Sequence, residues 1–121
     1  MVRMDNAILE KSKAFAVRIV NLYRHLVAEK HEFTLAKQIL KSGTSVGANC
    51  REATRAQSTA DFISKMNIAL KEADETAYWL ELLQETGYLT KGQYESIYTD
   101  CQALIKLLVR IVKTTRIKVK N

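Results

Sequence analysis

The chain has no proline and only four glycines among its 121 residues, and this scarcity restricts its fold more than any other feature. β-Sandwiches and barrels need many tight turns, which draw on glycine, proline and asparagine. The turn-forming residues here suffice for only about three connections, so we expect an all-α fold. The length fits one domain, and a mean hydropathy of −0.17 with 26% charged residues is typical of a globular protein.

Four stretches carry apolar or small residues at alternating steps of four and three, which is the spacing of a helix with one buried face. They cover residues 6–29, 34–57, 60–86 and 91 to about 113, where the last helix should fray. Capping pairs separate them, Ser58 with Asp61 and Thr90 with Gln93, and Gly87 suits a left-handed helix end. Short connections predict an antiparallel up-down-up-down four-helix bundle formed by residues 1–121, with 116–121 as a flexible basic tail.

The second stretch is unusual because its inner face carries small and polar residues. Asn49 falls on the apolar stripe, and a buried amide costs stability unless it is hydrogen-bonded. We therefore expect a cross-helix polar network that fixes helix register, with ligand binding as the alternative; its members would be Ser45, Asn49, Glu52 and, on the third helix, Glu72. Gly43 and Gly47 are expected to let another helix approach closely.

The residues do not combine into a recognisable catalytic or metal site. Di-iron sites in bundles need a glutamate and a histidine three residues apart, and this spacing is absent. Cys50 lies next to no side chain that could act as its base. The segment from Gly43 to Gly47 lacks the lysine that follows the last glycine of a phosphate-binding loop. We expect no enzyme activity, no metal and no cofactor.

The N-terminal residues lack the apolar stretch of a signal sequence, and no run of about 18 apolar residues predicts a membrane span. We therefore expect a cytoplasmic protein whose Cys50 and Cys101 stay reduced as small buried hydrophobes.

Several large apolar residues lie outside the main stripes. Exposed aromatic rows mark subunit contacts more often than bare surface, although wide apolar faces also occur on well-covered bundle helices. We expect a homo-oligomer whose interface includes Tyr23 of the first helix and Tyr78, Trp79 and Leu82 of the third.

Charge is the strongest functional signal. The chain carries a net charge of +6, the third helix is acidic and the C-terminal quarter is basic. One basic stripe lies on the second helix, with small Thr44 and Ala48 in its middle. A second basic stripe lies near the C-terminus, from Lys106 onward, where the sequence contains no acidic residue. Such cations contact phosphates independently of sequence; the alternatives are a solvated face or pairing with the acidic third helix. The predicted contact residues are Lys37, Lys41, Arg51, Arg55, Lys106, Arg110, Lys113 and Arg116.

The middle of the chain also carries a recognisable pattern over residues 35–90. It comprises Ser45, Val46, Asn49 and Glu52, then Asp61-Phe62, Ile68-Ala69, Glu72 and Glu75, and a closing Leu83 with Gly87-Tyr88-Leu89. The pattern resembles the four-helix-bundle family named after proteins encoded in intervening sequences of bacterial 23S rRNA genes, to which the accessory variability determinant proteins of diversity-generating retroelements are similar in fold. The resemblance implies a homopentamer with a basic surface and no catalytic activity.

The retroelement proteins bind nucleic acid and a reverse transcriptase, so the resemblance implies both kinds of partner. Together with the charge pattern, this leads to a hypothesis: a non-enzymatic, oligomeric nucleic-acid-binding protein that favours RNA or a ribonucleoprotein. The alternative hypothesis is a protein-interaction scaffold that docks an acidic protein partner.

Overall fold

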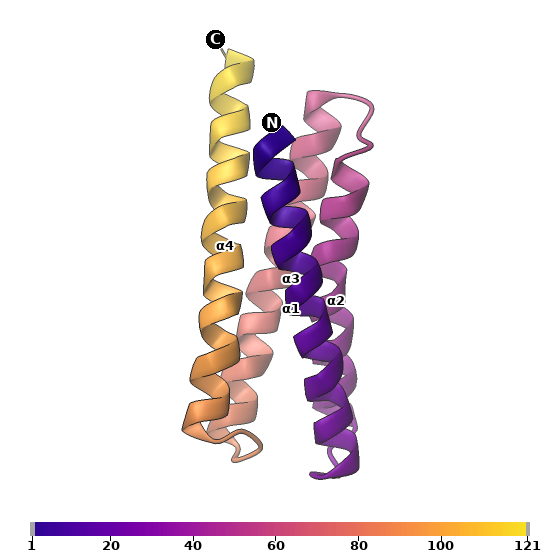
Figure 1. The fold of residues 1–121 in the computed structure, drawn as a ribbon, viewed down its shortest axis with the longest axis vertical. Helices are drawn as coiled ribbons and strands as arrows, with labels where there is room; N and C mark the ends of the chain where they lie inside the picture. The colour runs from indigo at the N-terminus through magenta and orange to yellow at the C-terminus, as the bar shows by residue number, and fades with distance from the viewer. Residues whose placement is uncertain (1, 121) are drawn as a thin grey trace.

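The computed structural model describes the backbone of residues 2–120 and the side chains of residues 6–118. Four long helices follow one another up and down (Figure 1): α1 (Val2–Ala28), α2 (Thr34–Ala53), α3 (Thr59–Glu85) and α4 (Lys91–Lys120). The predicted all-α, antiparallel four-helix bundle is confirmed.

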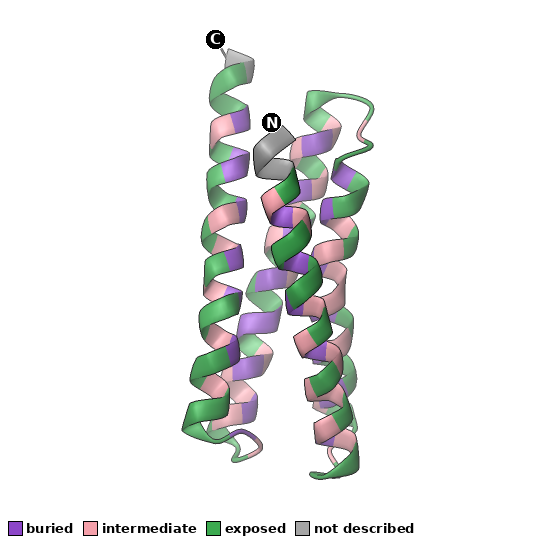
Figure 2. Ribbon diagram, in the orientation of Figure 1, coloured by how far each residue is buried: buried purple, intermediate pink, exposed green. Residues whose placement is uncertain are grey.

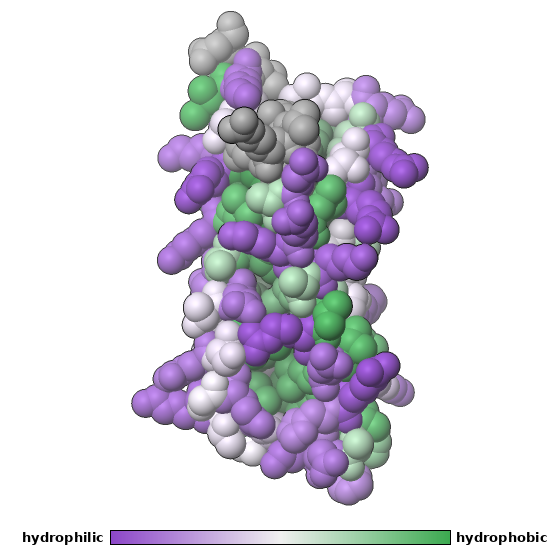
Figure 3. Space-filling view, in the orientation of Figure 1, coloured by the Kyte–Doolittle hydropathy of each residue, from purple (hydrophilic) through white to green (hydrophobic). Residues whose placement is uncertain are grey.

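Each helix packs beside its neighbours in the chain, and α4 returns to α1, so the helices form a ring in which α1 lies diagonally across from α3. The α1–α4 pair has the least contact of the four neighbouring pairs. Figure 1 shows these two helices separating toward the end of the bundle where α1 finishes and α4 starts. Figure 3 shows apolar surface inside this opening, bordered by hydrophilic side chains.

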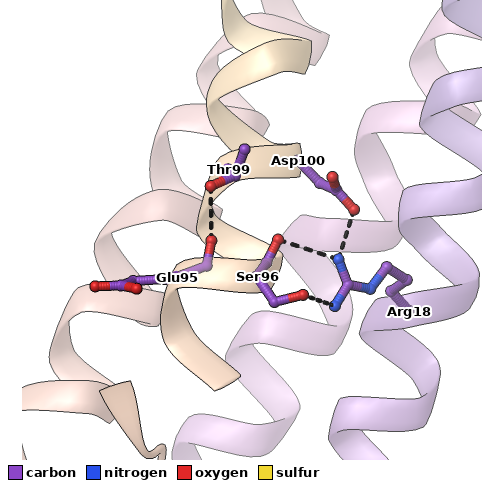
Figure 4. A network of polar contacts seen from close by, with 5 residues as sticks. All are labelled: Arg18, Glu95, Ser96, Thr99 and Asp100. Carbon is purple, nitrogen blue, oxygen red and sulfur yellow. Dashed lines mark hydrogen bonds and ion pairs between the residues drawn. The ribbon is translucent and has the colours of Figure 1, made fainter. Parts of the chain in front are cut away.

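One arginine joins the two sides of this opening (Figure 4). Nη1 of Arg18 on α1 lies 2.6 Å from Oδ2 of Asp100 and donates to the carbonyl of Ser96 at 3.2 Å, while Nη2 donates to the Ser96 hydroxyl at 2.8 Å. Both charged side chains are partly exposed, so the ion pair itself contributes little to stability. Its geometry does fix where α4 meets α1.

The core follows the predicted stripes closely. Figure 2 shows buried residues on the sides of the helices that face the bundle axis. On α1 and α2 the predicted stripe positions are buried except for half-buried Leu22, Leu35 and Asn49, and the buried positions of α2 are Ile39, Ser42, Val46 and Ala53. The predicted stripe positions of α3 and α4 are all buried: Phe62, Met66, Ala69, Ala73, Thr76, Leu80, Leu83, Ile97, Cys101, Leu104, Leu108 and Ile111. The largest fully buried side chains come from all four helices; they include Phe15, Ile19, Ile39, Met66, Leu80 and Leu108.

The two glycines of α2 mark its closest approach to α1. A Cβ atom at Gly43 would lie 2.7 Å from Cγ1 of Ile19, too close for any packed structure. At Gly47 a Cβ would lie 3.4 Å from the backbone oxygen of Ser12, an ordinary contact. The predicted close-packing role is therefore confirmed, with Gly43 as the more restrictive position.

The helix ends follow the predicted capping chemistry. Ser58 accepts a hydrogen bond from the amide of Asp61 at 3.1 Å, and Thr90 and Gln93 cap each other reciprocally at 2.9 and 3.1 Å. Gly87 has a φ of +85°, the left-handed conformation that suits glycine.

Three helix ends differ from the prediction. Helix α1 begins at Val2 and not at residue 6. Regular α2 ends at Ala53, not at 57, because the amides of Thr54, Arg55 and Ala56 bond three residues back and tighten the chain before Ser58 extends to cap α3. In contrast, α4 does not stop near 113 but continues to Lys120, so residues 116–120 of the expected tail are helical. Asn121 lies outside the described residues.

The polar network needs a larger correction. Ser45 donates to the carbonyl of Lys41 at 2.6 Å, and Asn49 Nδ2 donates to the carbonyl of Ser45 at 2.8 Å, so both bonds stay within α2. Asn49 is only half-buried at the edge of the helix, where a carbonyl one turn earlier satisfies its amide, and Glu52 is exposed.

Glu72 is the fourth residue of the expected network, and it lies on α3. Its pKa is raised by burial and by the charge of Glu75, while Lys41 of α2 lowers it. The buried hydrogen bond between α2 and α3 instead joins the Thr76 and Ser42 hydroxyls at 2.9 Å, so small hydroxyl side chains supply the polar cross-helix contact.

Candidate nucleic-acid interface

A groove of about 570 Å³ runs between the first half of α1 and the second half of α2. Three cations border it: Lys13 comes from α1, Arg51 from the last turn of α2, and Arg55 from the segment that follows α2. Glu52 is the single acidic residue in the lining, so positive charge prevails. The remaining lining residues are short or apolar: Leu9, Ser12, Ala16, Thr44, Gly47 and Ala48.

The groove exists because the sequence places small side chains where α1 and α2 meet. Gly47 and Ala48 leave the α2 surface almost bare, and Ala16 does the same on α1. The Thr44 hydroxyl donates to the carbonyl of Leu40 at 2.7 Å, which holds it against its own helix. A phosphate group could therefore approach the backbone while longer cationic side chains reach it from both helices.

The positive charges of the basic cluster, Lys13, Arg51 and Arg55, are not paired with acidic side chains among the described residues. All three residues are exposed, and none forms an ion pair with another described side chain. Arginine presents a planar fork that matches phosphate oxygens, so these side chains suit an external anion.

The predicted stripe on α2 divides into two parts in the structure. Arg51 and Arg55 line the groove together with Thr44 and Ala48, as the sequence predicts. Lys37 and Lys41 are exposed on the same helix but outside the groove, and the charge of Lys41 acts on Glu72 of α3.

Lys13 lines the groove although it was not among the contact residues predicted from the sequence. A second row of apolar residues runs along α1 beside the main stripe, and it consists of Leu9, Ala16, Val20, Tyr23 and Val27. Lys13 occupies the position in this row between Leu9 and Ala16. A charge inside an apolar row marks a position at the edge of a packed face, and this signal was available from the sequence.

The C-terminal cations also divide. Lys113 and Arg116 line a separate hollow of about 360 Å³ between α3 and α4, whose other lining residues are Asn67, Leu70, Val109, Val112 and Ile117. Lys106 and Arg110 are exposed on α4 and do not line it. The α1/α2 groove and this hollow lie on opposite sides of the bundle, because the α1–α2 and α3–α4 pairs face each other across the ring.

The predicted oligomer contacts do not form one patch within a single chain. Tyr78 is 57% exposed on α3, next to half-buried Trp79 and Leu82, and its ring packs edge-on against Trp79 at 5.2 Å. Tyr23 is half-buried on α1, which lies diagonally across from α3.

No histidine or cysteine is among the lining residues of the groove. Nε2 of His25 is buried without a hydrogen-bond partner among the described residues, and His31 takes a φ of +54° in the α1–α2 connection. Burial raises the pKa of Cys50 to about 11, and burial with the charges of Asp74 and Glu81 raises that of Cys101 to about 12. Both thiols are free. Among the described residues, no three metal-binding side chains gather into a cluster.

These raised pKa values predict slow thiol chemistry. At a pH near 8 the thiolate fraction of Cys50 is roughly 100-fold lower than that of an unperturbed thiol. Burial also restricts the access of a reagent to the sulfur atom, which slows the reaction further. Ellman's reagent should therefore label the native protein far more slowly than the urea-unfolded chain. Equal labelling rates would contradict the burial of both cysteines.

The same pKa values predict the pH dependence of stability. Above a pH of about 9 the unfolded chain releases its thiol protons while the folded chain retains them, so the free energy of unfolding should fall as the pH rises toward 11. Below pH 9 this contribution is fully present. Urea titrations of the wild type and of Cys50→Ala across this range measure it, and the variant should show the weaker pH dependence.

Comparison with known proteins places the chain in a family. The sequence profile of the 23S rRNA-intervening sequence protein family matches residues 4–110. The chain belongs to this family. The resemblance of residues 35–90 to the intervening-sequence family is thus confirmed. The match reaches into all four helices, and the whole α1/α2 groove lies inside the matched segment.

The structural relative agrees with this family assignment. A crystal structure of a protein of unknown function from the S23 ribosomal protein family of Bacteroides thetaiotaomicron has a TM-score of 0.90 and 63% sequence identity, covering 91% of this chain and 98% of that one. No curated protein matches the chain. None of the described helices combines the length and apolar character needed to cross a membrane. The family match ends at residue 110, before Lys113 and Arg116.

Proposed function

We propose that this intervening-sequence family protein is a non-enzymatic, homo-oligomeric, cytoplasmic nucleic-acid-binding protein that favours RNA. The observation that carries the proposal is the α1/α2 groove, in which Lys13, Arg51 and Arg55 border a floor of small side chains. Groups of unpaired cations above closely accessible backbone are suited to sugar-phosphate chains, and their contacts are independent of base sequence.

The preference for RNA over DNA is inferred from the descriptions of the family and of the structural relative, not from the groove itself. The family takes its description from 23S rRNA, and the structural relative is described as a member of a ribosomal protein family. The sequence pattern of residues 35–90 also resembles that of retroelement accessory proteins. That resemblance would imply a pentameric assembly, and it extends the proposal to a ribonucleoprotein containing a reverse transcriptase. A ring of chains that each carry a net charge of +6 would strengthen the attraction to phosphate.

The direct test is fluorescence anisotropy with nuclease-treated protein against a structured RNA, a DNA duplex and a heparin control, from about 50 to 200 mM salt. The proposal predicts binding that prefers RNA to heparin at the higher salt. Weak binding that does not distinguish the three and disappears at the higher salt would contradict it. Sedimentation velocity on the same sample reports the oligomeric state.

A further inference from the structure

The hollow between α3 and α4 differs chemically from the α1/α2 groove. Leu70, Val109, Val112 and Ile117 give it an aliphatic lining, and Lys113 and Arg116 supply the charge. Val109 is 46% exposed and Ile117 is 51% exposed, so their side chains present apolar surface to solvent. No acidic residue lines this hollow.

The aliphatic surface of this hollow favours a protein partner over a nucleic acid. Sugar-phosphate chains gain little from exposed valine and isoleucine, whereas apolar side chains of a protein gain the full benefit of burial. The flanking cations have no acidic neighbours in sequence, since no acidic residue follows Lys106. The surface is therefore complementary to a segment that is apolar in the centre and acidic at its edges.

The spacing of the exposed residues indicates the shape of that segment. Val109, Val112, Lys113, Arg116 and Ile117 follow one another at helical steps on one face of α4, over roughly 12 Å of helix axis. A groove between two helices, with aliphatic residues on the floor and charges on the rim, is the arrangement that accepts an amphipathic helix.

We propose that the α3/α4 groove docks an acidic amphipathic helix of a protein partner, an interaction beyond the proposed nucleic-acid binding. Aliphatic residues along the centre of the partner helix pack on Val109 and Ile117, and aspartate or glutamate residues beside them meet Lys113 and Arg116.

The position of the groove allows both partners to bind together. The α1/α2 and α3/α4 grooves lie on opposite sides of the ring of helices. Both lie at the end of the bundle where α1 begins and α4 finishes, and there α4 stands beyond the α2–α3 connection (Figure 1). One chain can therefore hold RNA on one side and a protein helix on the other.

The test is a selection from a display library of helical peptides in which leucine, alanine, glutamate and lysine vary at each position, with the full-length protein as bait. Enriched peptides should carry aliphatic residues at steps of three and four, flanked by acidic residues. Their affinity should fall by about tenfold or more for the Val109→Ser/Ile117→Ser variant. Val17→Ser is the matched control, because Val17 is 54% exposed on α1, and it should leave peptide affinity unchanged.

RNA binding by the Val109→Ser/Ile117→Ser variant should equal that of the wild type, which separates this proposal from the nucleic-acid proposal. The docking proposal is overturned if no peptide is enriched, if enriched peptides lack acidic residues, or if they bind the double variant as tightly as the wild type. It is also overturned if the double variant changes the sedimenting species, which would make a second copy the occupant. Binding that is confined to phosphatidylglycerol vesicles would likewise overturn it.

Discussion

Replacing Lys13, Arg51 and Arg55 together by glutamate is expected to weaken RNA binding by about 100-fold at about 100 mM salt. Each cation removed from a phosphate contact eliminates one favourable interaction, and each glutamate adds repulsion. The slope of log affinity against log salt should also become shallower by roughly two for a single-stranded RNA and by nearly three for a duplex. Anisotropy titrations at several salt concentrations measure both quantities.

A matched triple variant separates a local site from a general field. Lys30, Lys71 and Lys91 are exposed residues outside the groove, and their change to glutamate alters the net charge by the same amount. That variant should retain affinity within a few-fold of the wild type at about 100 mM salt, where the Debye length is about 10 Å. If both variants lose affinity equally, the charge acts only as a diffuse field and the groove is not the binding site.

Replacing Gly43 by valine is expected to reduce the free energy of unfolding by about 3 kcal/mol. The first added carbon would lie 2.7 Å from Cγ1 of Ile19, and Ile19 is fully buried in the core. Ile19 is also β-branched, so its χ1 angle is restricted within a helix and its side chain cannot easily rotate away. Either α1 must shift away from α2 or the core must repack, and both cost stability.

Urea denaturation measures this loss, with Gly92→Val as the matched control. A Cβ at Gly92 would meet nothing within 4 Å, so the same substitution there should be neutral or slightly stabilising. Adding Ile19→Ala to Gly43→Val should restore part of the lost stability, because it removes the atoms in conflict. A Gly43→Val variant as stable as Gly92→Val would contradict the close α1–α2 packing that shapes the groove.

The fold was largely predictable because periodicity alone identifies buried faces. Ser42 and Thr76 fall on apolar stripes despite their hydroxyls, and both are buried where the stripes place them. Helix ends were predictable where a side chain caps the backbone, as at Ser58 and Thr90. The end of α2 was not, because backbone bonds of Thr54 and its successors determine it.

The candidate site was only partly predictable, since a groove requires two helices and periodicity describes one at a time. Arg51 and Arg55 were identified from the stripe on α2, but Lys13 enters only when α1 packs against it. Asn49 was expected to bond across helices because its stripe position suggested full burial. Whether a stripe position is fully buried or lies at a half-buried edge depends on how the neighbouring helices pack, and one sequence does not reveal that packing.

The most direct test of the account is methyl NMR of alanine-labelled protein during titration with a structured RNA. Ala16 and Ala48 line the α1/α2 groove, whereas Ala14 and Ala103 line a hollow between α1 and α4 and provide internal controls. If RNA binds in the α1/α2 groove, the Ala16 and Ala48 methyl signals shift first and most strongly, while those of Ala14 and Ala103 stay in place. Shifts at Ala14 and Ala103 without shifts at Ala16 and Ala48 would contradict it.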